Sequence, residues 1–138
     1  INDYWRFMAT AFHHVHIKSK DPHATVAWWV DMFGAVAKPE FKFGTMYFTP
    51  VELDGVTINI TGHAPEEAVG MTEAQSIPYW GLEHIGLQVD DMDTILARFE
   101  EQGRKIHVRR PGPGNFEIAF VDAPDGVVLE LLYLQEGN

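Results

Sequence analysis

The chain has 138 residues, of which 46% are hydrophobic and 22% charged, proportions typical of one globular domain with a buried core. Its formal net charge is −10 and it has no long basic run, so nucleic acid is not expected as a partner. The absence of cysteine excludes disulfides and thiolate ligands, and no apolar stretch approaches the ~20 residues of a membrane span. We expect a single domain, residues 1–138, located in the cytoplasm and with no membrane partner.

The first half of the chain predicts a strand, a helix and three further strands. Residues 14–19 alternate with the period of two of a strand, and Asp21-Pro22 then has the form of a helix N-cap followed by proline. Apolar residues recur at helical spacing until Gly34, which is placed to end the helix. Strand-like runs follow at 35–41, 45–52 and 55–61. Residues 12–61 therefore form a first βαβββ unit.

The second half repeats this order. A strand is predicted at 84–89, and Asp91 caps a helix that ends at Gly103. Further strands are predicted near 106–109, 116–121 and 127–133. Residues 82–134 thus form a second βαβββ unit, and the Glu-, Ala- and Pro-rich residues 62–81 are predicted to be a linker loop.

Packing of the two units is expected because a single unit would expose the apolar face of its sheet. Two units can curl their sheets into a half-open barrel with the helices outside. We therefore predict an α+β fold in which two βαβββ units pack together. The N-terminal residues Trp5, Phe7 and Met8 are expected to dock on this domain or on a second copy of the chain.

The two units also repeat at the level of individual residues. FHHVHIK at 12–18 is answered 70 positions later by LEHIGLQ at 82–88. DGVTINI at 54–60 is answered 71 positions later by DGVVLEL at 125–131. The repeat pairs polar residues that interrupt otherwise apolar strands, which indicates one shared site.

These paired residues are His14 with His84, and Asn59 with Glu130. A carboxylate inside a buried strand is costly unless a cation, a proton or hydrogen-bond donors lie near it. Two imidazoles and a carboxylate bind divalent Fe, Mn, Zn, Ni or Co and leave positions open for substrate. We predict one such metal per site, held by His14, His84 and Glu130, with Asn59 as either a fourth ligand or a hydrogen-bonding neighbour.

The remaining candidate residues concern catalysis and substrate binding. His16 shares a strand face with His14 and is the candidate catalytic base, with Glu130 as the alternative. The predicted substrate pocket is lined by Trp29, Phe48, His63 and Trp80.

From Phe12 to Leu134, the chain resembles the vicinal oxygen chelate superfamily, which includes glyoxalase I, methylmalonyl-CoA epimerase, fosfomycin-modifying enzymes, extradiol dioxygenases and bleomycin resistance proteins. The resemblance is carried by HVHI at 14–17, DP at 21–22, WW at 28–29 through FG at 33–34, EHIGL at 83–87, and DAPDG at 122–126 leading to Glu130. It implies that the paired βαβββ units form a half-open curved sheet, a barrel-like cup. It also implies a homodimer and a metal held at His14, Asn59, His84 and Glu130. The implied function is that of a glyoxalase-like lyase, isomerase or epimerase, which chelates adjacent oxygens of a small substrate and stabilises an enediolate.

Departures from the individual family patterns keep the reaction open. Glyoxalase I carries a glutamate where this chain has Asn59, and the epimerase has a glutamine there. Extradiol dioxygenases share the His, His, Glu set but carry a tyrosine where this chain has Phe120, and no histidine lies between His107 and Glu130. The alternatives are an Fe(II)-dependent dioxygenase and a non-catalytic small-molecule binding or resistance protein.

Overall fold

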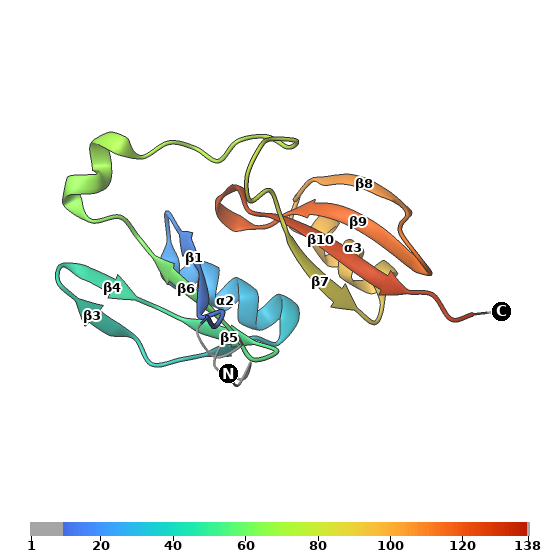
Figure 1. Ribbon diagram of the computed structural model, residues 1–138, viewed down its shortest axis with the longest axis horizontal. Coiled ribbons are helices and arrows are strands. Elements are labelled where there is room, and N and C mark those ends of the chain that lie inside the picture. The colour runs from blue at the N-terminus through green and yellow to red at the C-terminus, as the bar shows by residue number, and fades with distance from the viewer. Residues whose placement is uncertain (1–9, 138) are drawn as a thin grey trace, which may run out of the picture. The chain divides into compact units, whose positions relative to one another are not determined.

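The computed structural model describes residues 10–137, so the expectation for Trp5, Phe7 and Met8 lies outside the described residues. The chain divides into two compact units, Ile1–Gly70 and Met71–Asn138, called unit 1 and unit 2. Each unit has a strand, then an α-helix, then further strands that complete one sheet (Figure 1). This order confirms the predicted α+β class built from two βαβββ units.

Unit 1 contains one six-stranded sheet and one α-helix. Its elements are β1 (His14–Lys18), α2 (Pro22–Phe33), β2 (Val36–Ala37), β3 (Phe41–Phe43), β4 (Met46–Phe48), β5 (Val51–Leu53), β6 (Val56–Thr61) and the 3₁₀ helix η1 (Pro65–Gly70). The strand order is β2-β5-β6-β4-β3, and β1 pairs with β6 in parallel. The other pairs are antiparallel. Because β6 pairs with β1, β4 and β5, it is the central strand of the sheet.

Two of the predicted strands of unit 1 are each divided in two. The run at 35–41 becomes β2 and β3, and the run at 45–52 becomes β4 and β5. The breaks fall at Pro39 and Pro50, because proline has no N–H to give to a strand ladder. Neighbouring bonds hold the segments together across the breaks: the Lys38 N–H donates to the Pro50 carbonyl at 2.8 Å, and the Thr49 N–H donates to Ile60 at 2.9 Å.

The helix of unit 1 has the predicted boundaries. The Asp21 side chain accepts from the Ala24 N–H at 3.1 Å, and Gly34 closes the helix in the left-handed conformation at φ 69°. The helix packs against β2, β5 and β6, and Trp29 is only 1% exposed. Ile17 and Ile60, which pair across β1 and β6, are buried on the same side. The core of unit 1 therefore lies between α2 and one face of the sheet.

Unit 2 has the same plan with unbroken strands. Its elements are β7 (Ile85–Val89), α3 (Met92–Glu101), β8 (Ile106–Pro111), β9 (Phe116–Asp122), the 3₁₀ turn η2 (Pro124–Gly126) and β10 (Val128–Leu134). The order is β7-β10-β9-β8, with β7 parallel to β10 and the other pairs antiparallel.

The core of unit 2 forms under α3, which buries Met92, Ile95, Leu96 and Phe99. The predicted cap is present, since the Asp91 carboxylate accepts from the Thr94 N–H at 3.0 Å. The β8–β9 ladder shifts register between Ile106 and Val108, which places His107 in a bulge. Among the described residues, no helix is both long enough and apolar enough to cross a membrane.

Candidate functional site

The best-defined polar group of unit 2 is the pair formed by His84 and Glu130. His84 directly precedes β7, and its Nε2 lies 3.0 Å from Oε2 of Glu130 on β10. Gly86, two residues after His84, stands opposite Glu130 in the β7–β10 register. The repeat therefore predicted two residues that the structure brings together.

Two further residues hold the His84 ring in place. Oε1 of Glu83 lies 3.0 Å from Nδ1 of His84, on the side of the ring away from Glu130. The Phe120 ring meets it edge-on, with centroids 5.0 Å apart and an interplanar angle of 90°. Carboxylates accept hydrogen bonds and one lies at each ring nitrogen, so the tautomer with the proton on Nδ1, donated to Glu83, is the one that would leave Nε2 free to bind a metal. Sequence reasoning missed Glu83, although an acidic neighbour of a candidate ligand is a readable signal.

The pair is half-buried, with 30% of the His84 side chain and 18% of the Glu130 side chain exposed. A carboxylate in this setting is stabilised by a cationic or hydrogen-bonding partner, which here is the imidazole. Within residues 10–137 no three His, Asp or Glu side chains gather closely enough to hold a metal. The His84–Glu130 pair of unit 2 therefore offers two atoms that could bind a metal, the imidazole nitrogen Nε2 and the carboxylate oxygen Oε2.

The polar residues of unit 1 share the sheet face opposite α2. In the β1–β6 register His14 lies across from Thr57, His16 from Asn59, and Lys18 from Thr61. Paired residues of parallel strands point to the same face, and residues two apart on one strand do so as well. His14 and Asn59 thus lie on one face, one step apart along the ladder. His14 is exposed, and its Nδ1 lies 2.8 Å from Nδ1 of His13.

His16 is the most constrained histidine on this face. Its Nε2 lies 2.7 Å from Oγ1 of Thr61, and the Phe48 ring stands at an angle of 62° to it with centroids 5.8 Å apart. Burial, followed by the charges of Lys18 and His14, lowers the pKa of His16 from its ordinary value. These surroundings favour the neutral imidazole, which is the form that accepts a proton.

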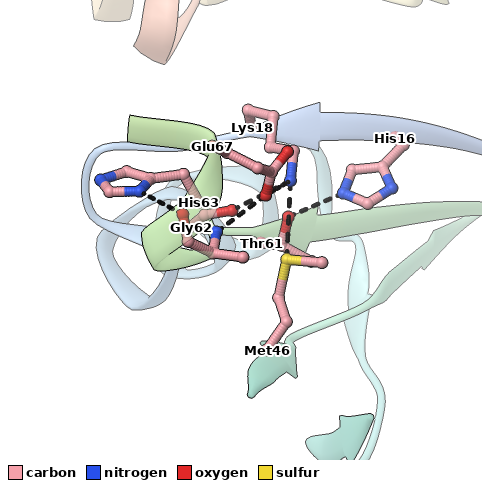
Figure 2. A network of polar contacts seen from close by, with 8 residues as sticks. His16, Lys18, Met46, Thr61, Gly62, His63 and Glu67 are labelled. Carbon is pink, nitrogen blue, oxygen red and sulfur yellow. Dashed lines mark hydrogen bonds and ion pairs between the residues drawn. The ribbon is translucent and has the colours of Figure 1, made fainter. Parts of the chain in front are cut away.

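A polar network ties the start of η1 to the end of β1 (Figure 2). Nζ of Lys18 lies 2.9 Å from Oε1 of Glu67, and the same oxygen accepts the Ala64 N–H at 2.7 Å. These bonds, the backbone bond first, lower the pKa of Glu67. Lys18 also donates to the Gly62 carbonyl at 3.4 Å. No sequence pattern signalled this contact, because 49 residues separate the lysine from the glutamate.

The four predicted pocket residues occupy different surroundings. Phe48 stacks on Phe41, with centroids 4.9 Å apart, and contacts His16. Trp29 is a residue of α2 whose side chain is buried in the core, on the sheet face opposite His16. His63 is exposed, with Nδ1 3.0 Å from the Ala64 carbonyl oxygen, and Trp80 is fully exposed. Phe48 thus lies beside the proposed base, whereas Trp29 packs as a core residue.

The family of the chain follows from its sequence match. Residues 13–120 match the family model described as the Glyoxalase/Bleomycin resistance protein/Dioxygenase superfamily. The chain belongs to this superfamily. The resemblance to vicinal oxygen chelate proteins is thereby confirmed.

Curated relatives carry glyoxalase names. The chain is 28% identical over 149 residues to glyoxalase I of Saccharomyces cerevisiae, an alignment covering 91% of the chain and 45% of the yeast protein. It is 25% identical over 135 residues to a lactoylglutathione lyase of Salmonella typhimurium, covering 91% and 93%. A lactoylglutathione lyase of Neisseria meningitidis is 30% identical over 105 residues, covering 72% and 70%. The chain spans less than half the length of the yeast protein.

Solved structures share the fold. A glyoxylase/bleomycin resistance protein/dioxygenase domain from Frankia has a TM-score of 0.71 at 20% identity, covering 94% of this chain and 95% of that domain. The fosfomycin resistance protein FosX from Listeria monocytogenes has a TM-score of 0.67 at 18% identity, covering 90% and 93%. A mutant of that FosX was solved with Mn(II) and 1S,2S-dihydroxypropylphosphonic acid. At these identities the likeness shows the fold alone.

Proposed function

We propose that the chain is a divalent-metal-dependent enzyme of the lyase or isomerase type, epimerases included, acting on a small substrate with two adjacent oxygens. The observation that carries the proposal is the His84–Glu130 pair, an imidazole nitrogen and a carboxylate oxygen 3.0 Å apart on one sheet face. Relatives named lactoylglutathione lyase support the lyase class. Asn59 stands where the glyoxalase I pattern has a glutamate, so we propose a substrate other than a glutathione hemithioacetal.

The donor atoms of unit 2 suit a divalent metal. With Glu83 accepting the Nδ1–H of His84, the Nε2 lone pair is available to a cation. Glu130 adds an anionic oxygen, and imidazole with carboxylate is a donor set that Fe, Mn, Zn, Ni and Co accept. We propose His14 as the third ligand and Asn59 as the fourth, supplied by the same chain or by a second copy.

The proton-transfer step is assigned to residues of unit 1. When bound, a divalent metal supplies a Lewis acid that polarises the two substrate oxygens and so acidifies the neighbouring C–H. His16 is the proposed base, and the Thr61 hydroxyl at 2.7 Å orients its ring. The Phe48 ring lies beside this imidazole, with centroids 5.8 Å apart. Glu130 is the alternative base.

Calorimetric titration of chelator-treated protein tests the proposal. We expect stoichiometric binding of at least one of Mn(II), Zn(II), Ni(II), Co(II) or anaerobic Fe(II), and loss of that binding in His84→Ala. The control is His23→Ala, since His23 also pairs with a carboxylate, Glu40, at 2.7 Å but lies outside the proposed site. Equal binding by the wild type and His84→Ala would contradict the assignment.

Comparison of metals separates the reaction classes. An acid–base mechanism transfers no electron to or from the metal, so it predicts comparable turnover with Zn(II) and Fe(II). Activity that needs both Fe(II) and dioxygen would instead favour the dioxygenase alternative. The homodimer implied by the family resemblance remains a prediction, and light scattering of the purified protein measures it.

A further inference from the structure

Unit 2 contains a hollow next to the His84–Glu130 pair. Its volume is about 330 Å³, and it is lined by Ile77, Pro78, Glu83, His107, Val108 and Phe120. This volume is at the small end of the range for ligand sites in proteins, which start near 300 Å³, and suits a group the size of a single ring. Four of the six lining side chains are apolar, so the hollow favours an uncharged occupant.

The hollow shares two residues with the surroundings of His84. Phe120 presents its ring to His84 at a centroid distance of 5.0 Å, and Glu83 approaches Nδ1 of His84 at 3.0 Å. Both residues also line the hollow. A molecule held at the His84–Glu130 pair can therefore extend past the Phe120 ring into the hollow.

A histidine–aspartate pair supplies the polar end of the hollow. Nε2 of His107 lies 2.6 Å from Oδ1 of Asp122, and the bulge in β8 aims this histidine across the ladder toward β9. The carboxylate accepts hydrogen bonds, so it favours the tautomer with the proton on Nε2, in which Nδ1 is an acceptor. Among the described residues, Asp122 is the hydrogen-bond partner of this ring. A carboxylate that orients an imidazole in this way makes it a well-positioned acceptor for a hydroxyl proton.

We propose that this hollow binds a compact, uncharged aryl group bearing a hydroxyl, with the hydroxyl donating to Nδ1 of His107. The ring would pack against Phe120, Val108 and the proline of the Ile77-Pro78 segment. The inference rests on the proposed function only in making this group the distal end of the substrate. The binding itself needs residues of unit 2 and no metal.

The test is an NMR titration of metal-free protein with phenol and with anisole, which has the same ring but no donor. We expect both to shift the amide resonances of Ile77, Val108 and Phe120. Phenol should bind about fivefold more tightly than anisole, the ratio expected for one hydrogen bond. Equal affinities, or shifts confined to other residues, would overturn the assignment.

Variants test whether the His107–Asp122 pair causes the preference for phenol over anisole. His107→Leu should bind phenol and anisole equally, whereas the matched control His23→Leu, which removes the exposed histidine beside Glu40, should keep the wild-type ratio. Phe120→Ala should weaken both ligands while leaving their ratio unchanged, which separates loss of the wall from loss of the acceptor. Circular dichroism confirms that each variant is folded, and a phenol preference that survives in folded His107→Leu would refute the role of His107.

The two proposals fail separately. If His84→Ala loses metal but still prefers phenol, both stand. If metal binding is absent from the wild type but the phenol preference depends on His107, the proposed function fails and the hollow remains. If metal binds at His84 but phenol shows no preference over anisole, the hollow assignment fails by itself.

Discussion

Replacing Trp29 by alanine should destabilise unit 1 strongly. The side chain, on the buried side of α2, is 1% exposed, and the rings of Trp28 and Phe33 lie at centroid distances of 5.6 Å each. A buried tryptophan removes ~200 Å² of surface from water, which at ~25 cal/mol/Å² amounts to ~5 kcal/mol. Reducing this for residual burial in the unfolded chain gives ~4 kcal/mol, within the ~3–5 kcal/mol range of measured Trp→Ala changes.

Urea denaturation followed by far-UV circular dichroism measures this loss. The matched control is Trp80→Ala, which removes the same side chain from a fully exposed position and should change the free energy of unfolding by less than ~0.5 kcal/mol. Trp29→Phe should lie between the two, because much of the apolar surface remains. A Trp29→Ala change below ~1 kcal/mol would refute the core assignment and return Trp29 to the list of substrate-contacting residues.

Three further predictions follow from individual contacts. Glu83→Gln should weaken metal binding about 10- to 100-fold in calorimetry, because the partner that orients His84 is altered; an unchanged affinity would count against the proposed tautomer. Acidification should release η1 from β1: the pKa of Glu67 is lowered, so its bonds contribute stability above its unfolded pKa and lose it as pH falls through the folded value. Amide protection factors over residues 64–67, which correct for the intrinsic pH dependence of exchange, should fall in that window, and unchanged protection factors would contradict the release. Gly126→Ala should destabilise the protein by more than ~1 kcal/mol in thermal unfolding, since φ is 73° and the added Cβ would lie 2.5 Å from Cβ of Ala74; an unchanged melting temperature would show that this turn can relax.

Local signals were sufficient to predict the order of elements. Aspartates at Asp21 and Asp91 cap the two helices as expected, and Gly34 ends the first in the left-handed conformation. The strand breaks at Pro39 and Pro50 were not predicted, although both prolines are visible in the sequence. The alternation of apolar residues predicted continuous strands. In the structure the strands break near both prolines, because proline has no N–H to donate to the ladder.

The internal repeat indicated that His84 and Glu130 belong to one site, because each matches a polar residue of the first unit, His14 and Asn59. The structure places the His84 and Glu130 side chains 3.0 Å apart. The repeat did not predict the contacts of His84 with Glu83 and Phe120. Glu83 is the preceding residue in the chain, and Phe120 lies on β9. The helical spacing of Trp29 and its apolar neighbours predicted an apolar helix face. It did not show whether that face packs in the core or lines a substrate pocket. Contacts such as Lys18 with Glu67 depend on the path of a loop, which no local periodicity encodes.

The proposed divalent-metal site depends on His84 and Glu130 of unit 2. The most direct test is elemental analysis of protein purified without chelators, with Glu130→Ala and, as a control, Glu100→Ala at an exposed position on α3. We predict about one Fe, Mn, Zn, Ni or Co ion per chain in the wild type and in Glu100→Ala, and its loss in Glu130→Ala. Equal metal content in all three proteins, or no metal in the wild type after incubation with each ion, would contradict the claim.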